Sequence, residues 1–264
     1  MTSPFTARRP LRERAYPDPS NLETRRAVYR FRRPPLDLVG EVAARLATAP
    51  PGTLLDVGSG SGVHTRALRD RHPDRTVIGL DLSHGMAGHT GPPAVVADAE
   101  ALPVADGVVA GCLAVHMLYH VPRPRLAVAE LARVLTDDGL VVIVAQDGGD
   151  RAEVEGLWRD CVHATGGEWR RESPLDLSGM AVLAADHFES VTRHDFPGET
   201  VVPDWRPVVA YQESTRALSG LSDAGFDAAM AEFTARVRSE VARTGVFRFT
   251  NRVGILTARR PLRS

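Results

Sequence analysis

The segment HMLYH at positions 116–120 holds two histidines and a tyrosine that can exchange protons. The chain contains no lysine, and its 32 basic residues are all arginine, which stays protonated in proteins. Histidine and tyrosine are therefore its natural bases near neutral pH. His116 and His120 also have the four-residue spacing of a helical zinc pair. We expect no metal, because the segment leaves a strand, lacks an intervening glutamate and has no evident third ligand.

A cluster of glycines lies earlier in the chain, in LLDVGSGSGVHT at positions 54–65. An apolar run leads into Gly58, Gly60 and Gly62, and a helix could begin just after them. A dinucleotide fingerprint would have its third glycine where Val63 stands, and the lysine of a phosphate-binding loop is missing. Glycine leaves the backbone open to close approach. The motif predicts a ligand-binding turn of another kind.

Alternating strands and helices are predicted around both motifs. Short apolar runs predict strands at 54–57, 76–80, 94–97, 108–115 and 140–145. Helices are predicted from Ser20, with Glu23 completing a capping box, to about Arg32, over 36–46, and from near Pro124 to 135. Such a pattern is typical of a parallel sheet covered on both faces, whose ligands bind beyond the carboxyl ends of the strands.

The second half of the chain changes pattern. Apolar spacing predicts helices over 154–161 and 226–241 and strands at 190–196 and 246–257. The roughly fifty residues between these two strands are too many for a bare loop, so we expect a helical lid over about 202–245. The predicted fold is α/β: a doubly wound, mostly parallel seven-stranded sheet with a C-terminal antiparallel hairpin. Residues 1–50 are expected to form a helical arm over the ligand cleft, and 51–264 the main domain.

Composition narrows the class of protein. The 264 residues are 43% hydrophobic and 25% charged, which suits one large core with a small lid. No apolar run reaches the ~18 residues of a membrane span, and the first residues lack the apolar block of a secretory signal. Cys112 and Cys161 are too few for a disulfide framework. We therefore expect a cytoplasmic protein with buried, reduced thiols and no membrane contact.

Charge is unevenly distributed along the chain. Residues 1–33 carry nine arginines against three acidic residues, although the net charge of the whole chain is −1. Such a basic arm, with aromatic residues interleaved, could contact a phosphate backbone. We favour a solvated helix face, or an arm folded over an acidic ligand cleft, and do not expect nucleic acid as a partner.

Successive segments resemble the motifs of a known family. They are LLDVGSGSG, VIGLDLS, VVADAEALPVADG, HMLYHVPRP and ELARVLTDDGLVVI, and together they span about 54–145. In order and spacing they are similar to class I S-adenosylmethionine-dependent methyltransferases, specifically the broad small-molecule group. The resemblance implies a Rossmann-like methyltransferase fold and S-adenosylmethionine as cofactor. It also implies methyl transfer to an O, N or C atom of a small organic substrate, which we expect to belong to specialised metabolism.

The resemblance implies a cofactor site at the strand ends. The glycine turn would contact the methionine moiety, and Asp81 would accept hydrogen bonds from the ribose hydroxyls. Asp98 with the amide of Ala99 would read the adenine edge, between apolar side chains. Tyr16, Arg25 or Tyr29 of the arm could reach the cofactor carboxylate, unless they are ordinary helix-surface residues. The cofactor-binding residues expected are Tyr16, Gly58, Ser59, Gly60, Asp81, Leu82, Met86, Asp98, Ala99 and His116.

The acceptor site is expected beside the HMLYH segment. His116 matches a position that borders the methionine end of the cofactor, and it is the first candidate for orienting the substrate or taking its proton. His120 matches a histidine that often plays a supporting role in relatives. Tyr119, Trp205 and Tyr211 are candidates for shaping the substrate pocket.

Other interpretations of the same residues stay open from sequence. Asp81 and Asp98 could cap following helices, and Met86 could belong only to the core. His120 could be structural, and Trp205 and Tyr211 could be ordinary core residues. An RNA methyltransferase that uses the basic arm is one alternative function, against which stand the net charge and the lack of a recognised RNA-binding motif. A non-catalytic, cofactor-binding regulatory module is the other.

Overall fold

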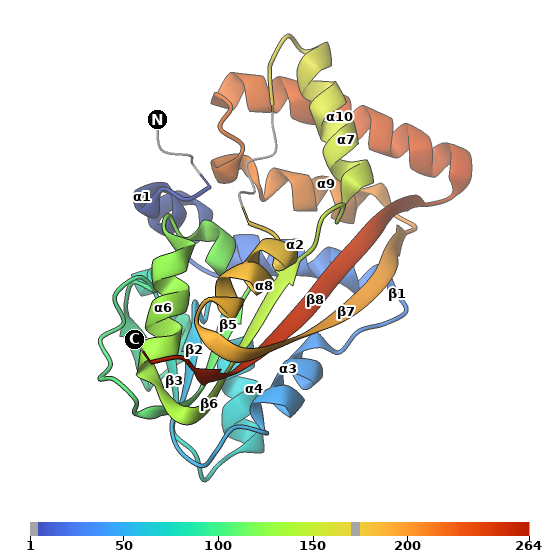
Figure 1. Ribbon diagram of the computed structural model, residues 1–264. Helices are drawn as coiled ribbons and strands as arrows, with labels where there is room; N and C mark the ends of the chain where they lie inside the picture. The colour runs from blue at the N-terminus through green and yellow to red at the C-terminus, as the bar shows by residue number, and fades with distance from the viewer. Residues whose placement is uncertain (1–4, 170–174, 264) are drawn as a thin grey trace.

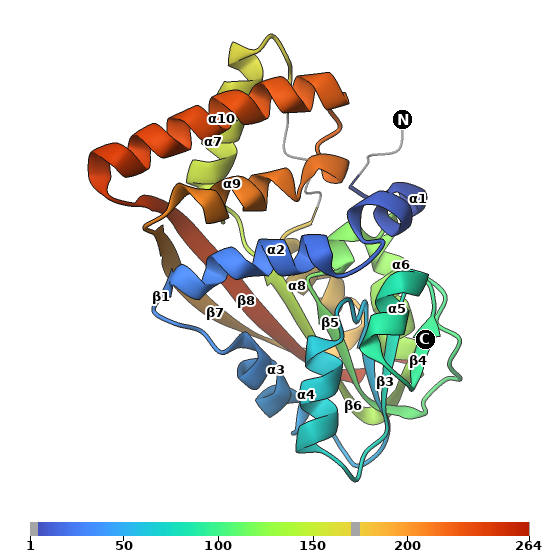
Figure 2. The ribbon, with the colours of Figure 1, turned by 180° about the vertical axis from the view of Figure 1, so that it is seen from behind.

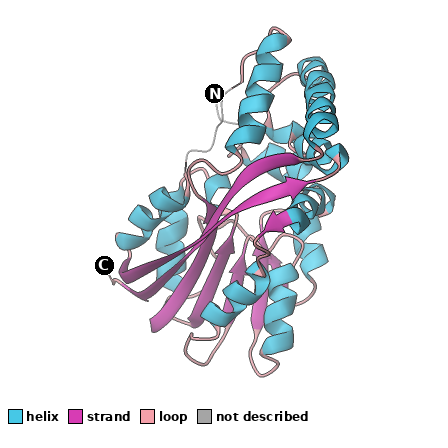
Figure 3. Ribbon diagram, turned by 90° about the vertical axis from the view of Figure 1, so that its right-hand side faces the viewer, coloured by secondary structure: helices cyan, strands magenta, loops and turns pink. Residues whose placement is uncertain are grey.

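The protein is built on one sheet with helices on both faces (Figure 3). The computed structural model describes residues 5–169 and 175–263. The strands are β1 (Arg32–Arg33), β2 (Leu54–Val57), β3 (Val77–Asp81), β4 (Ala94–Val96), β5 (Val109–Val115), β6 (Leu135–Gln146), β7 (Phe188–Val202) and β8 (Phe247–Pro261). Their order across the sheet is β1-β7-β8-β6-β5-β2-β3-β4.

The pairing confirms the predicted fold class. Neighbouring strands from β4 to β6 are parallel, whereas β8 runs antiparallel to both β6 and β7. All seven expected strands are present. The eighth, β1, is a two-residue strand of the arm that pairs antiparallel with β7. The arm is therefore joined to the sheet as well as lying over it.

Most of the helices fall into three groups around the sheet (Figures 1 and 2). The bounds are α1 (Arg8–Pro10), α2 (Ser20–Ala27), α3 (Leu38–Leu46), α4 (Val63–Arg71), α5 (His84–Thr90), α6 (Pro124–Val134), α7 (Ala152–Ala164), α8 (Leu177–Ala185), α9 (Trp205–Glu213) and α10 (Asp223–Thr244). Helices α3 and α4 pack on one face, and α6 and α8 on the other. Helices α7, α9 and α10 form a separate layer beyond the carboxyl ends of the parallel strands, and α2 crosses between this layer and the sheet.

The helical layer has a core of its own. Trp158 of α7 packs against Phe226 and Phe233 of α10, and all three side chains are buried. β8 extends into this layer, where Phe247 and Phe249 lie on its buried face. Buried Phe247 and Phe249 alternate with exposed Arg248, in agreement with the period-two pattern of the sequence. The long strands β7 and β8 thus tie the helical layer to the sheet.

Two predictions about the arm were wrong. The first helix ends at Ala27 and passes through a 3-10 turn into β1, instead of continuing to about Arg32. The Arg32 guanidinium is buried, and its Nε donates to Asn251 Oδ1 at 2.5 Å. This tertiary contact outweighs the helical pattern. The capping box is also absent, because the Ser20 amide donates to the Asp18 carboxylate at 2.8 Å and the helix has no side-chain cap.

Two further features concern the protein's environment. Cys112 and Cys161 are both buried and free of disulfide bonds. Within residues 5–169 and 175–263, none of the helices combines the length and the apolarity that crossing a bilayer requires.

Gly62 sets the approach of α4 to α5. It precedes α4 with a φ of +72°, and a Cβ there would lie 2.7 Å from Thr90 Cα. We expect Gly62→Ala to lower the free energy of unfolding by about 3 kcal/mol, because left-handed backbone and overpacking both oppose a side chain. Gly88→Ala in α5 is the matched control, since nothing lies within 4 Å of its Cβ position. Urea denaturation of both variants makes the test. An equal stability of the two would contradict the packing role of Gly62.

Candidate active site

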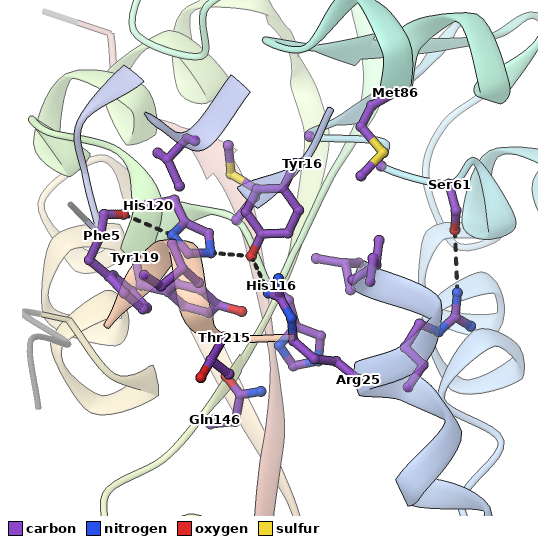
Figure 4. Close-up of a pocket in the computed structure, with 18 of the residues that line it drawn as sticks. Phe5, Tyr16, Arg25, Ser61, Met86, His116, Tyr119, His120, Gln146 and Thr215 are labelled. Atoms are coloured by element: carbon purple, nitrogen blue, oxygen red, sulfur yellow. Dashed lines mark hydrogen bonds between the residues drawn. The ribbon is translucent and has the colours of Figure 1, made fainter. Parts of the chain in front are cut away.

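A cavity of about 680 Å³ lies between the carboxyl ends of the parallel strands and the helical layer (Figure 4). The turns after β2, β3, β4 and β5 form its base. Its walls include residues of the arm, of helices α7 and α9, of the segment after α9 and of β8. Segments far apart in sequence meet here because the ends of neighbouring parallel strands share one edge of the sheet. The cavity therefore lies where the sequence predicts a ligand.

The glycine turn after β2 presents bare backbone to the cavity. Gly58 and Gly60 have φ of +72° and +54°, and a Cβ on Gly58 would lie 2.7 Å from Met117 Cβ. The amides of Gly58 and Ser59 donate to Leu80 O at 2.7 and 2.9 Å, which fixes the turn against β3. The Ser59 hydroxyl bonds to Thr90 Oγ1 at 2.9 Å. The hydroxyl and the backbone amide of Ser59 are therefore both engaged within the fold, and it is the glycines beside it that leave room for a ligand.

Asp81 ends β3 beside this turn. Its Oδ2 accepts from the Gly60 amide at 2.9 Å and its Oδ1 from the Ser83 amide at 2.8 Å. Burial raises the pKa of the Asp81 carboxyl, and the backbone donors oppose that rise. Each oxygen keeps a lone pair for a further donor. The interpretation of Asp81 as a helix cap is wrong, since Ser83 caps α5 by accepting from the Met86 amide.

The other wall of this end is formed by Leu82, Met86, Asp98 and Ala99. Met86 is only 1% exposed, so it belongs to the core and to the cavity wall together. Asp98 follows β4 in a turn, with Oδ1 accepting from the Glu100 amide at 2.9 Å, and so caps no helix. Its Oδ2 pairs with Arg8 Nε of the arm at 2.7 Å.

His116 follows β5 in a strained backbone conformation. Its φ is +53°, and its amide donates to Val144 O at 2.8 Å, which holds it at the end of the strand. Ring atom Nδ1 is buried, with no hydrogen-bond partner in the described part of the chain. Burial, aided by nearby His64, Arg151 and Arg26, lowers the pKa of His116 to about 3. The ring is therefore neutral at pH 7 and is a weak base.

His120 fastens the arm to the sheet domain (Figure 4). Its Nδ1 lies 2.9 Å from Phe5 O and its Nε2 lies 2.8 Å from the Tyr16 hydroxyl. A carbonyl only accepts, so Nδ1 carries the proton and Nε2 accepts from Tyr16. The Tyr16 oxygen in turn accepts from Arg25 Nη1 at 2.7 Å. Burial lowers the pKa of His120 to about 4. Both ring nitrogens are engaged by the arm, which favours the structural interpretation of His120 over a catalytic one.

The three residues expected to shape the substrate pocket differ in position. Tyr119 lines the cavity beside Phe5, with 5.9 Å between ring centroids, and Tyr211 lines it from α9. Burial raises the pKa of both phenols. Trp205 is not among the described residues that line the cavity. It packs on the helical layer, where Arg206 and Arg238 stack on its indole ring.

Several cavity residues were missed by the sequence analysis. Arg151 precedes α7, donates to the Tyr29 hydroxyl at 3.1 Å and pairs with Asp150. His64 opens α4 beside the glycine turn, and Trp158 lies further along α7. The helical spacing of residues 154–161 predicted a buried face but not what that face covers. Among the described residues, no three His, Cys, Asp or Glu side chains are grouped so that they could hold a metal ion.

Comparisons with known proteins agree with this geometry. Residues 55–143 match the family model described as a methyltransferase domain. The chain is 32% identical over 216 residues to a malonyl-[acyl-carrier protein] O-methyltransferase of Geobacter sulfurreducens, covering 78% of this chain and 79% of the relative. A solved structure described as a methyltransferase from an antibiotic biosynthesis pathway of Anabaena variabilis aligns with a TM-score of 0.59 at 15% identity, covering 84% and 96% of the two chains. Another, described as a methyltransferase of Bacillus halodurans, gives 0.58 at 16% identity, covering 86% and 100%.

The hydrogen-bond chain through Tyr16 makes a prediction about the arm. Tyr16→Phe removes the hydroxyl that joins Arg25 to His120. We expect the free energy that holds the arm against the sheet domain to fall by about 1 to 2 kcal/mol. We expect trypsin to cut at the arginines of the arm about five- to thirty-fold faster under native conditions. Glu13→Gln, which breaks exposed ion pairs with Arg9 and Arg12 within the arm, is the control. Unchanged cleavage in Tyr16→Phe would mean that this network does not hold the arm.

Proposed function

Because the chain belongs to the class I S-adenosylmethionine-dependent methyltransferases, we propose that it transfers the methyl group to a carboxylate oxygen of a small organic acid. One observation carries the choice of acceptor. The part of the cavity that lies beyond the strand ends, here called the acceptor half, holds Arg25, which has no acidic partner among the described residues. The histidines beside it, His116 and His120, are poor bases.

The residues of the cavity fit the cofactor. The bare backbone of Gly58 and Gly60 suits close approach of the methionine moiety, and Asp81 has lone pairs free for the ribose hydroxyls. Asp98 and the Ala99 amide would hold the adenine edge, between Leu82 and Met86. These acids and amides are the donors and acceptors that an adenosine group requires.

The methionine end of the cofactor would lie among basic groups. His64 Nδ1 is buried without a partner, and Arg26 nearby donates only to the Ser61 hydroxyl, at 3.5 Å, both among the described residues. Both suit the cofactor carboxylate, with Tyr16 and His116 bordering the same end. When bound, S-adenosylmethionine supplies the methyl group, whose bond to sulfur breaks as an acceptor lone pair forms the new bond and S-adenosylhomocysteine remains.

The charge of the acceptor half favours an anion. Arg25 donates to the Tyr16 hydroxyl and to Ser214 O, at 2.7 and 3.2 Å, and no carboxylate among the described residues balances its charge. Its Nε is buried and unpartnered there. Arg151 adds a second guanidinium, which is balanced by Asp150 and Glu155. A substrate carboxylate would neutralise Arg25 through charge-assisted hydrogen bonds.

The titration of the neighbouring groups favours an acceptor that needs no base. His116 and His120 have pKa values lowered to about 3 and 4, and the pKa values of Tyr119 and Tyr211 are raised. None of these four side chains is matched to proton removal near neutral pH. A carboxylate is already ionised there, so methyl transfer to it requires orientation alone. Neutral His116 and Tyr119 would orient it.

The relatives support the same acceptor class. The Geobacter relative is named for O-methylation of a malonyl group on a carrier protein, which is methyl transfer to an acid. We extend the class, and not the particular substrate, to this chain.

The proposal also assigns the arm and the lid. Residues 1–50, of which 5–50 are described, would cover the cofactor cleft, and 51–264 would form the methyltransferase domain with a helical lid at about 202–245. The ion pair of Arg8 with Asp98 supports a covering role for the arm. Arg8, Arg25 and Arg32 each bind a group of this chain, so these three arginines of the arm have a use other than RNA binding. A regulatory module would bind the cofactor without turnover of any acid.

A pH profile tests the acceptor class. We expect the enzyme to form S-adenosylhomocysteine and a methyl ester from short dicarboxylic half-thioesters, and none from the matched primary amides. Because the carboxylate is ionised and no base is needed, kcat/KM should stay level between about pH 6 and 9. Mass spectrometry of the product and a coupled assay provide the measurements. A rate that rises with one ionisation in this range, or turnover of alcohols or amines alone, would contradict the proposal.

Arg25 provides the matched variant. Arg25→Gln should raise KM for the acid about ten- to a hundred-fold, since a hydrogen bond to a charged group contributes about 1.5 to 3 kcal/mol. Arg25→Lys keeps the charge and should lose less. Arg9→Gln removes an exposed arginine of the same arm and serves as the control. Equal KM values in Arg25→Gln and Arg9→Gln would exclude Arg25 as the acid-binding residue.

A further inference from the structure

Unpartnered polar atoms gather at the cavity. In the described residues, eight buried side-chain nitrogen or oxygen atoms lack a hydrogen-bond partner. Four belong to residues that line the cavity, and all four are nitrogens: Arg25 Nε, His64 Nδ1, His116 Nδ1 and Trp158 Nε1. The first three are assigned above to the cofactor and the acid. Trp158 is the one on the helical layer, and nothing in the proposed reaction uses it.

The indole of Trp158 is fixed in place. The residue is 1% exposed, and its ring centroid lies 5.1 Å from that of Phe226 and 5.8 Å from that of Phe233. An indole N–H only donates, and leaving a buried donor unsatisfied costs about 1 to 3 kcal/mol. Folded proteins keep few such groups without a reason. Because the surrounding rings hold the indole, the missing partner must come to the N–H.

One face of α7 turns Trp158 toward the cavity. Val154, Glu155 and Trp158 line it at the spacing of successive helical turns, after Arg151 at the start of the helix. At 1.5 Å per residue, Trp158 lies about 10 Å further along the helix axis than Arg151. Trp169 and Leu218 add apolar lining to the cavity, and Thr215 and Ser219 add uncharged polar groups. With the carboxylate at Arg25, the body of the substrate would extend along α7 toward Trp158.

We propose that Trp158 determines specificity, and that its Nε1–H donates to an uncharged oxygen acceptor on the body of the substrate, such as a ketone, ester or amide carbonyl. This inference rests on the proposed function for the position of the carboxylate. The substrate class becomes an acid whose apolar body carries a carbonyl group remote from the carboxylate. A plain hydrocarbon body would leave the N–H unsatisfied and would bind less tightly.

Binding of matched probes tests the inference. The probes are a medium-chain fatty acid and a series of oxo-acids of equal length with the ketone moved along the chain. Calorimetry is performed on the full chain saturated with S-adenosylhomocysteine. We expect at least one oxo-acid to bind about three- to ten-fold more tightly than the plain acid, as one neutral hydrogen bond allows. Trp158→Phe should bind both equally. Phe226→Leu, which loosens the same aromatic cluster but keeps the N–H, should retain the preference.

The primary amides of the same acids separate this inference from the proposed function. They lack the negative charge, so a Trp158-dependent preference for the oxo-amide would support the inference even if no acid were methylated. The indole N–H proton resonance of the wild-type protein gives a readout that does not depend on folding of Trp158→Phe. The chain has three tryptophans, so Trp169→Phe and Trp205→Phe assign the third resonance, which should move downfield with the preferred probe. No preference among the probes, or a preference that survives in Trp158→Phe, would overturn the inference.

Discussion

The structure depends on one constraint, the parallel pairing of β2 with β3 and β5. Parallel neighbours end at the same edge of a sheet, so the residues that follow these strands must meet. Gly58 after β2, Asp81 at the end of β3 and His116 after β5 come together for this reason alone. Each belongs to a different part of the sequence and a different local conformation. The positive φ values of Gly58 and His116 show how sharply the chain turns away from the sheet at this edge.

The arm completes a site that the sheet only begins. The sheet edge supplies backbone and carboxylates, which suit an adenosine group but give no specificity for an acceptor. The arm adds Arg25, the hydroxyl of Tyr16 and the carbonyl of Phe5, which together engage His120. Both ring nitrogens of His120 are thereby engaged by the arm, and the Arg25 guanidinium is held beside the cavity. Burial lowers the pKa values of the histidines. It also strengthens the electrostatic attraction between an anion and Arg25, whose charge no described carboxylate balances.

Residues set by local pattern were predictable from the sequence. The strand and helix periods, the bare glycine turn and the acid that ends β3 depend on neighbours in the chain, and the predicted strands are all present. The tertiary contacts were not predictable. Arg32 was predicted to end the first helix. It lies instead in β1, where its side chain donates to Asn251 of β8, near the other end of the chain. The tautomer of His120 depends on Phe5, and Trp205 faces Arg238 and not the cavity. The sequence pattern predicted Trp158 as a buried residue of a helix, and it is one. Nothing in that pattern could predict that its indole N–H lacks a hydrogen-bond partner among the described residues.

A crystal structure of the full chain with S-adenosylhomocysteine tests the central claim most directly. The ribose hydroxyls should lie within hydrogen-bond distance of Asp81, the adenine edge should meet Asp98 and Ala99, and the sulfur should face the half of the cavity that holds Arg25 and His116. A nucleotide bound away from Asp81, or a sulfur turned away from Arg25, would contradict both the assigned cofactor site and the acid acceptor.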